Sequence, residues 1–319
     1  MAMKKLSELF NGVKAQTLIN VNENDNHPLI PEEDPNYQFP PLIIHLLLWL
    51  ISFGGKTPVC LSGPTGSGKS SIFTQIAARL RTRLYVVSCH ENMQIEDLFG
   101  HYVVSNGSTI WRDGPFIAGI KDENSAFVLL DEYDSLPQTT LTGLNALIEG
   151  RTFIVPQTGE YVNATTFGAK IIFCGNTLSD DDEELGTYLG TNKKSPTFKD
   201  RVIKHIATYP APTDVTTGVR SIEEAVLEAK VPQLPENIRI KFVEIANMVR
   251  AMYLAGETGV IFSTRTLVLW AELTVEYKRV KYPNPIFIAL DQAIANGYSS
   301  EQRNALHETV NMVIKETKP

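Results

Sequence analysis

The sequence predicts an α/β domain whose sheet is buried on both faces, followed by a small all-helical domain. From Lys56 to about Ala207, short apolar runs alternate with amphipathic runs, a pattern typical of buried strands separated by helices. Past Thr208 the strand patterns fade and four or five helical patterns follow, which predicts the second domain. The apolar runs are VCL (59–61), LYVVSC (84–89), AFVLL (126–130), KIIFC (170–174) and VIKHIA (202–207).

Composition narrows the class of protein. The chain has 319 residues, 35.5 kDa and 43% hydrophobic residues, so it can bury a sizeable core and is not predominantly disordered. It carries 29 Lys and Arg against 36 Asp and Glu, a net charge of −7. A protein that binds nucleic acid through its phosphates usually has a basic surface. A nucleic-acid partner is therefore disfavoured, and a role at DNA or RNA would need local evidence.

The N-terminal part of the sequence predicts no export signal and no membrane span. The first residues, MAMKKLSELFNGVKAQ, lack the apolar run of a secretory signal. The most apolar stretch, Leu42 to Phe53, is about a dozen residues long, shorter than a membrane span, and is expected to be a buried helix. The three cysteines (Cys60, Cys89 and Cys174) lie in apolar runs and cannot all pair. We therefore expect a cytoplasmic protein.

Residues 20–41 are rich in Asn, Asp, Glu and Pro, which favour turns and extended chain and leave little to bury. This composition predicts an N-terminal extension and linker over residues 1–38. The α/β domain is then expected over residues 39–212, with the helical domain over residues 213–319.

The strongest motif is a phosphate-binding loop directly after the first strand. GPTGSGKS (63–70) matches G-x-x-x-x-G-K-[ST] and opens a helical pattern. Its glycines allow successive backbone N–H groups to converge on phosphates at a helix N-terminus. Lys69 would reach the β- and γ-phosphates, and the Ser70 hydroxyl could ligate Mg²⁺. The predicted nucleotide-binding residues are Gly63, Pro64, Thr65, Gly66, Ser67, Gly68, Lys69, Ser70 and Ser71.

Two adjacent acids follow the third apolar run, about 60 residues beyond the lysine. In FVLLDEYD (127–134), Asp131 is the candidate Mg²⁺ ligand, and Glu132 is the candidate base that orients and deprotonates the attacking water. This pairing is typical of an ATPase. For Tyr133 and Asp134, turn formation is the better interpretation.

Asn176 follows the next run, in KIIFCGNT (170–177), where its amide could bond the attacking water or the γ-phosphate. The alternative is an ordinary turn-forming asparagine. Between the second and third runs, Asn106-Gly107 lies between VV and TIW and predicts a hairpin.

Together these motifs resemble the AAA+ ATPases, and within them the MoxR-type branch. Finer features resemble the ATPase subunit of aerobic cobaltochelatase (CobS): DPNYQFP (34–40), DEYD with a following proline, GNTLSDDDEELGTYLGT (175–191) and STRTLVLWAE (263–272). The resemblance covers about residues 30–280. It implies a P-loop NTPase fold with a parallel five-stranded sheet, flanking helices and a helical lid, and assembly into a ring that is usually a hexamer in this family. It also implies a hairpin insert within residues 98–120 near the pore; the alternative is a surface hairpin with Trp111 packed against its own helix.

The resemblance also implies two arginines that act on the γ-phosphate. Arg201, in KDRVI, matches the arginine that a neighbouring subunit lends to the site. Arg265, in STRT at the start of a lid helix, matches an arginine that senses the phosphate in its own chain. The alternatives are a solvated basic loop, which includes Lys193, Lys194 and Lys199, and an exposed arginine. The acidic run at 180–184 is interpreted as a solvated loop.

These expectations converge on a Mg²⁺-dependent ring ATPase that uses ATP to remodel a protein partner. The resemblance implies a partner with a von Willebrand factor A-type (VWA) domain, such as a CobT-like protein. Three alternatives stay open: a motor subunit for cobalt insertion into a corrin ring, a DNA- or RNA-dependent ring ATPase, and a nucleotide-gated scaffold that hydrolyses little ATP.

Overall fold

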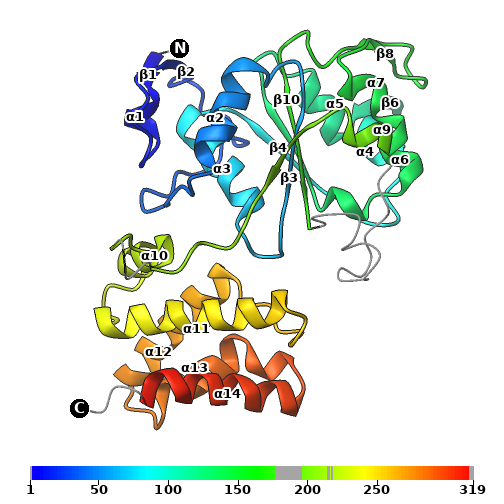
Figure 1. Ribbon diagram of the computed structural model, residues 1–319. Coiled ribbons are helices and arrows are strands. Elements are labelled where there is room, and N and C mark those ends of the chain that lie inside the picture. The colour runs from blue at the N-terminus through cyan, green and yellow to red at the C-terminus, as the bar shows by residue number, and fades with distance from the viewer. Residues whose placement is uncertain (1, 177–195, 214–215, 217, 316–319) are drawn as a thin grey trace. The chain divides into compact units, whose positions relative to one another are not determined.

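The computed structural model describes residues 2–176, 196–213, 216 and 218–315. The chain forms two compact units, which are coloured by residue number in Figure 1. The first unit consists of residues Met1–Asp34, Pro41–Pro64 and Gly68–Ala207. The second consists of residues Pro35–Pro40, Thr65–Ser67 and Thr208–Pro319. The three residues Thr65–Ser67 thus group with the second unit although they belong to the phosphate loop.

A parallel five-stranded sheet forms the centre of the first unit, in the order β11-β3-β10-β7-β4. Each of the five predicted apolar runs forms one strand, so this part of the prediction is confirmed. The strands are β3 (Val59–Ser62), β4 (Leu84–Ser88), β7 (Phe127–Asp131), β10 (Lys170–Gly175) and β11 (Ile203–Ile206).

The register brings the ends of three strands to one edge of the sheet. Cys174 of β10 pairs with Asp131 of β7, and Gly175 pairs with Ser62 of β3. The phosphate loop, the acids and Asn176 each follow one of these strand ends. The expected functional residues therefore meet at the carboxyl edge, where ligands bind in open α/β sheets.

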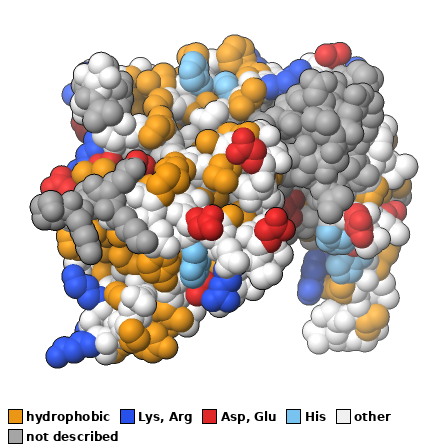
Figure 2. Space-filling model, turned by 60° about the horizontal axis from the view of Figure 1, so that its bottom comes forward, with side chains coloured by type: hydrophobic (Ala, Val, Ile, Leu, Met, Phe, Trp, Pro, Cys, Tyr) orange, Lys and Arg blue, Asp and Glu red, His pale blue; other side chains and the backbone are white. Residues whose placement is uncertain are grey.

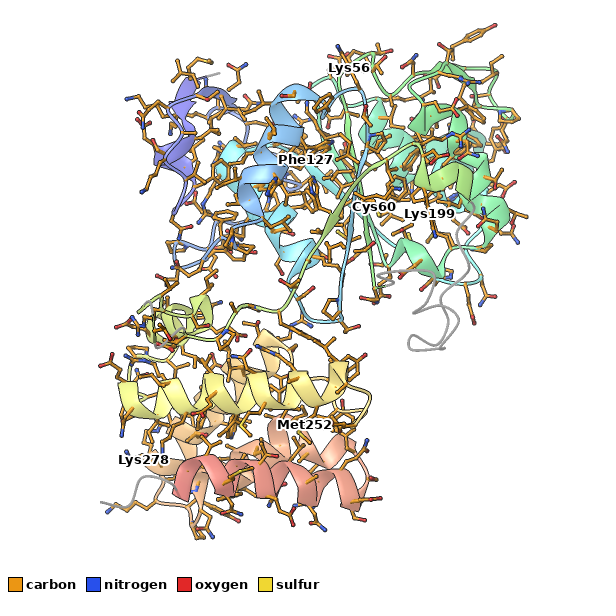
Figure 3. All side chains as sticks on the ribbon, viewed as in Figure 1. Lys56, Cys60, Phe127, Lys199, Met252 and Lys278 are labelled. Carbon is orange, nitrogen blue, oxygen red and sulfur yellow. The ribbon has the colours of Figure 1, made fainter. Side chains whose placement is uncertain are left out.

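Helices cover the sheet on both sides (Figure 1). On one side lie α2 (Ile43–Ser52) and α3 (Lys69–Leu80). On the other side lie α4 (Ile95–Phe99), α5 (Pro115–Ile120), α6 (Gln138–Gly143) and α7 (Asn145–Ile148). A short 3₁₀ helix, η1 (Tyr133–Ser135), follows β7, and α9 (Pro196–Lys199) precedes β11. Figure 3 labels Cys60 of β3 and Phe127 of β7, whose side chains are buried between these layers.

The apolar stretch at residues 42–53 forms α2, but the expectation of a buried helix is only half met. Ile43, Leu46 and Leu47 are buried, as are Trp49 and Leu50. On the opposite face Ile44, Leu48 and Ile51 are exposed. The helix is thus apolar on both faces and buries one of them.

Two hairpins project from the first unit and are joined to each other. β5 (Gly100–Ser105) and β6 (Ser108–Asp113) form the hairpin expected from Asn106-Gly107, and both turn residues have the positive φ that such a turn needs. The second hairpin, β8 (Phe153–Ile154) and β9 (Tyr161–Val162), was not predicted. The Tyr102 hydroxyl of the first hairpin donates to the Gln157 carbonyl of the second over 2.6 Å.

A lysine and two aromatic contacts complete this arrangement. Lys121, after α5, bonds Asp113 over 2.8 Å and Glu160 over 2.5 Å, and so bridges the base of the first hairpin to the connecting loop of the second. Trp111 packs against the core of the first unit and stacks edge-on with Tyr102. Its ring therefore belongs to the packed base of the hairpin, and the position of the hairpin near a pore stays a prediction.

The N-terminal segment folds onto the first unit. β1 (Ala2–Lys5) and β2 (Leu18–Val21) pair antiparallel around α1 (Leu6–Leu9), and Phe10 is 1% exposed. Arg83, before β4, bonds Asp25 over 2.8 Å and Asp122 over 3.1 Å. The sequence placed residues 1–38 outside the α/β domain, whereas the contacts group Met1–Asp34 with it.

We expect Phe10→Ala to destabilise the first unit by about 3–5 kcal/mol, because it removes a fully buried aromatic ring. The matched control is Phe53→Ala at a ring that is 48% exposed, with a loss of about 1 kcal/mol or less. Urea-induced unfolding followed by circular dichroism measures both. Equal losses in the two variants would show that the N-terminal segment contributes no more than a surface residue.

The second unit is helical among its described residues. It contains α10 (Ile222–Lys230), α11 (Glu236–Leu254), α12 (Thr264–Arg279), α13 (Pro285–Ala293), η2 (Ala295–Gly297) and α14 (Ser300–Lys315). Phe242 of α11 stacks on Trp270 of α12 with ring centroids 3.6 Å apart, at the centre of its core. Over the described residues of both units, the structure has no helix of the length and apolarity that crossing a bilayer requires.

Candidate functional site

The phosphate loop has the backbone conformation that its glycines predict. It follows β3 and leads into α3, whose first residue is Lys69. Gly66 and Gly68 have φ of 77° and 83°, in the left-handed region that favours glycine. Gly63 fills a tight place, because a Cβ there would overlap the carbonyl oxygen of Ala207. Larger residues at these positions would change the path of the loop.

Lys69 is held inside the loop by three oxygen atoms. Its Nζ donates to the carbonyls of Gly63 (2.9 Å) and Pro64 (3.0 Å) and to Oδ1 of Asn176 (2.9 Å). The side chain is only 8% exposed. Burial lowers the pKa of Lys69, while neighbouring groups that include Asp131 and Asp134 oppose the shift. The ammonium group is thus largely removed from water and held inside the loop. A triphosphate bound in this loop would place its negative charge close to it.

Ser70 and Asp131 form a pair of oxygen ligands suited to Mg²⁺. The Ser70 hydroxyl on α3 donates to Oδ1 of Asp131 at the end of β7 over 2.7 Å. Hydroxyl and carboxylate oxygens are the donors that Mg²⁺ prefers in nucleotide sites. The two residues predicted as metal ligands therefore lie together, and their chemistry fits the ion.

Glu132 stands next to this pair in an unusual backbone conformation. Its φ is 54°, which is uncommon for a residue with a side chain. The side chain is exposed, and no described residue bonds its carboxylate. Glu132 thus combines a strained backbone at a strand end with a carboxylate that is exposed to solvent. These two properties are expected of a residue that acts on a substrate or on water.

Asn176 is fixed from two sides. Its side chain accepts from Lys69, and its backbone N–H donates to Oδ2 of Asp134 over 2.6 Å. The amide therefore lies beside Lys69 of the phosphate loop. Its sensing role stays a prediction.

Sequence reasoning missed the part that Asp134 plays. We expected turn formation for Tyr133 and Asp134, and they do begin η1. Asp134 is also buried and anchors Asn176, and Tyr133 is buried with its hydroxyl accepting from the Cys60 thiol. The signal was available in DEYD, because a second acid two residues after Glu132 can turn back toward the next strand end.

Arg201 lies in the first unit and forms an ion pair within its own chain. Its Nε donates to Glu149, a carboxylate that also pairs with Arg151 over 2.6 Å. Glu149 had no role in the sequence analysis. Whether Arg201 acts on a neighbouring subunit stays a prediction. Lys193, Lys194 and the acidic run at 180–184 lie outside the described residues.

Arg265 lies in the first turn of α12, in the second unit. Ser263 caps this helix by accepting from the backbone N–H of Thr266 over 3.0 Å. The Arg265 side chain is exposed. Its sensing role stays a prediction.

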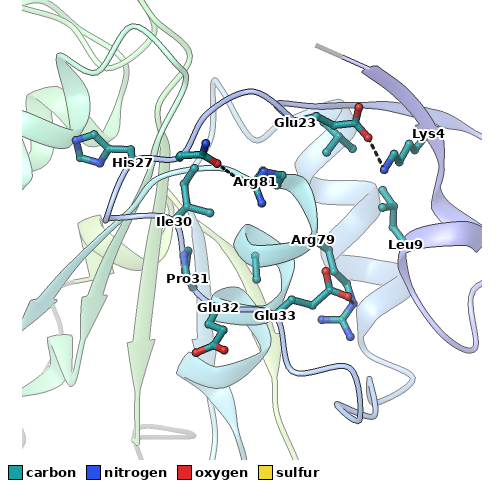
Figure 4. Close-up of a pocket in the computed structure, with 13 residues that line it drawn as sticks. Lys4, Leu9, Glu23, His27, Ile30, Pro31, Glu32, Glu33, Arg79 and Arg81 are labelled. Carbon is teal, nitrogen blue, oxygen red and sulfur yellow. Dashed lines mark hydrogen bonds and ion pairs between the residues drawn. The ribbon is translucent and has the colours of Figure 1, made fainter.

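A separate cavity of about 410 Å³ lies at the other end of α3 from the phosphate loop (Figure 4). Residues of the N-terminal segment and of Ala78–Arg81 line it. Its charged groups are largely paired: Lys4 bonds Glu23 over 2.6 Å, and Arg79 lies 3.9 Å from a carboxylate oxygen of Glu33. The cavity therefore has little unbalanced charge to attract a phosphate.

Comparison with known proteins adds two family matches. A model of AAA domains of the dynein-related subfamily matches residues 58–201. A model of the CbbQ/NirQ/NorQ C-terminal region matches residues 223–313. The first covers β3, β4, β7 and β10 of the sheet and the predicted site residues other than Arg265, and the second covers most of the helical unit.

Three curated relatives are similar to the chain. Protein NorQ of Paracoccus denitrificans is 36% identical over 34% of this chain and 39% of its own length. Protein CbbQ of Hydrogenophilus thermoluteolus is 32% identical over 35% of this chain and 42% of its own length. Aerobic cobaltochelatase subunit CobS of Sinorhizobium sp is 24% identical over 76% of this chain and 72% of its own length. The chain thus matches about two fifths of the length of NorQ and CbbQ.

Proposed function

Because this chain is an AAA+ ATPase of the MoxR type, we propose that it hydrolyses ATP with Mg²⁺ and uses the energy to remodel a protein partner in the cytoplasm. The observation that carries the proposal is the convergence of Lys69, Ser70, Asp131 and Asn176 at one edge of the sheet. A phosphate loop alone would indicate only nucleotide binding. The acids beside it supply the groups for hydrolysis.

Each residue of the site has a distinct task in this proposal. The backbone of the loop and Lys69 bind the β- and γ-phosphates, while Ser70 and Asp131 hold Mg²⁺. When bound, the ion supplies positive charge that stabilises phosphate oxygens. Glu132 accepts a proton from the attacking water, and Asn176 orients that water or the γ-phosphate. Asp134 keeps Asn176 in place.

The proposed active form is a ring of six chains. Arg201 would act on the ATP of the neighbouring subunit, where it exchanges its bond to Glu149 for the γ-phosphate. Arg265 would act on the ATP of its own chain. Light scattering of the ATP-bound protein tests this point, with an expected mass about six times the 35.5 kDa of one chain.

The proposed partner is a protein with a VWA domain of the CobT-like type. The joined hairpins offer a contact surface for such a protein, since Val104 is 80% exposed and Tyr161 is 73% exposed. The net charge of −7 argues against a nucleic-acid partner, because binding to phosphates usually needs a basic surface. On the face drawn in Figure 2, the visible Lys and Arg side chains are scattered and do not form a stripe.

We expect Val104→Asp to uncouple the partner from the ATPase. The variant places a charge on an apolar contact surface, so partner-stimulated phosphate release should fall by about tenfold or more. Basal phosphate release should be unchanged, because Val104 lies on the hairpin and not at the phosphate loop. Glu123→Gln, at an exposed acid outside both hairpins, is the control. Partner stimulation that survives Val104→Asp would exclude this hairpin as the contact.

A second candidate function is the motor subunit of a cobaltochelatase that inserts cobalt into a corrin ring. The favouring observation is the match to CobS, which extends over 76% of this chain and 72% of that protein. ATPase stimulation by cobalt and a corrin in the presence of reconstituted partner subunits would support it. Stimulation by the VWA partner alone would favour the broader proposal.

A further inference from the structure

A buried ion pair lies at the start of the helix that carries Arg265. Arg250 of α11 donates to both carboxylate oxygens of Glu223 of α10, over 2.6 and 2.7 Å. Both side chains are buried, at 2% and 0% exposure. Removing two such charges from water costs free energy that their mutual attraction roughly offsets, so the pair adds little net stability. We therefore ask which other residues the pair holds in place.

Those contacts converge on the residues around the cap of α12. The Arg250 Nε donates to the carbonyl of Phe262 over 2.7 Å. Thr264 donates its hydroxyl to Glu223 Oε1 over 2.6 Å. The ion pair thus forms hydrogen bonds to Phe262 and Thr264, the residues on either side of the cap residue Ser263. Thr264 directly precedes Arg265. The backbone that presents Arg265 is fixed by buried, charge-assisted hydrogen bonds.

The same pair is linked to the phosphate loop through Tyr209. The Arg250 guanidinium lies over the Tyr209 ring, 4.8 Å from its centroid. The Tyr209 hydroxyl donates to the carbonyl of Thr65 over 2.8 Å. Burial raises the pKa of Tyr209 to about 12, so the phenol remains a donor at neutral pH. All these residues belong to the second unit, which includes Thr65–Ser67.

We propose that Tyr209, Arg250 and Glu223 are positioning residues for ATP hydrolysis, which connect Thr65 of the phosphate loop to the first turn of α12 and so hold Arg265 for the γ-phosphate. The inference rests on the proposed ATPase function. It adds the chain of contacts through which a phosphate loop with bound nucleotide would orient Arg265. None of the three residues needs to touch the reacting atoms.

The test uses two mild variants, because removal of Glu223 or Arg250 would leave a buried charge unpaired and confound activity with folding. Tyr209→Phe deletes only the bond to Thr65 and keeps the ring under Arg250. Thr264→Val deletes only the hydroxyl that reaches Glu223. Their controls are Tyr277→Phe, at a half-buried tyrosine of α12, and Thr274→Val, at a buried threonine whose hydroxyl bonds the Trp270 carbonyl.

In the full chain with ATP and Mg²⁺, each variant should lower kcat by about 2- to 30-fold, the range found for substitutions along coupled networks. KM should stay unchanged, because the lost contact positions a group that acts in the transition state. Thr264→Ser should restore kcat. The double variant should lose less than the product of the two single losses, since both interrupt one connection. Melting temperatures should match those of the controls.

Three results would overturn the inference. In an active wild type, kcat values equal to those of the controls would show that the network has no role in hydrolysis. A raised KM with unchanged kcat would assign these residues to nucleotide binding alone. Losses that multiply in the double variant would show two independent contacts. A wild type without ATP hydrolysis, with Glu132→Gln indistinguishable from it, would instead overturn the proposed function, and the inference with it.

Discussion

Lys69→Ala is expected to abolish nucleotide binding under ordinary assay conditions. The substitution removes the ammonium group that three oxygens now hold in the loop. Charge-assisted bonds to phosphate oxygens would be lost, at a cost of about 3 kcal/mol or more, which is roughly 100-fold in Kd. Titration with a fluorescent ATP analogue in the presence of Mg²⁺ measures the change.

The control for this experiment is Lys56→Ala, at an exposed lysine before β3. It removes the same charge from the same unit and should leave Kd unchanged. Thermal unfolding of both variants checks that the sheet is intact. A Kd for Lys69→Ala close to the wild-type value would contradict the assignment of the loop as the phosphate site.

Glu132→Gln is expected to separate binding from turnover. Glutamine has nearly the same shape, so it can adopt the φ of 54° at this position, but its amide cannot accept the proton of the attacking water. General-base catalysis contributes about 10²- to 10⁴-fold, so kcat should fall by at least about 100-fold. The Kd for ATP should stay near the wild-type value, because Lys69 and the loop are unchanged.

Steady-state phosphate release and analogue titration measure the two quantities in parallel. Glu123→Gln serves as the control. Glu123 is an exposed acid of the same unit, and it precedes β7, at the opposite end of that strand from Asp131. Equal turnover in the Glu132 variant and the wild type would refute the role of this residue. In that case Asp131 and Asp134 would be the next acids to examine among the residues that the structure describes at this edge.

The sheet could be predicted from the sequence because of how its strands are buried. A strand covered by helices on both faces needs apolar residues at nearly every position, so the three central strands β3, β10 and β7 appear as continuous runs such as AFVLL or KIIFC. The edge strands β4 and β11 are partly exposed, and the β11 run includes Lys204 and His205. Asp131 directly follows AFVLL, Asn176 follows KIIFC after one glycine, and Lys69 and Ser70 end the loop that follows VCL. Since parallel strands present their carboxyl ends at one edge, the chain order alone brought these four residues together.

The features that were missed depend on contacts between distant residues. Glu223 and Arg250 are separated by 27 positions and lie in helices that also carry exposed charges, such as Glu228 and Glu244, so nothing local marks this pair as buried. Glu149 and Arg201, which pair over 52 positions, are likewise far apart in the chain. The N-terminal segment was interpreted as an extension because residues 20–41 are polar, yet Phe10 and Arg83 tie it to the first unit.

The joined hairpins have a mechanical consequence. Tyr102 with Gln157, and Lys121 with Asp113 and Glu160, cross-link two loops that are far apart in the chain. A force applied to the turn of either hairpin is therefore shared by both hairpins. Through Lys121 it reaches α5, which packs on β4 and β7. Because β7 ends at Asp131, such a force would reach the strand end where we propose that Mg²⁺ binds.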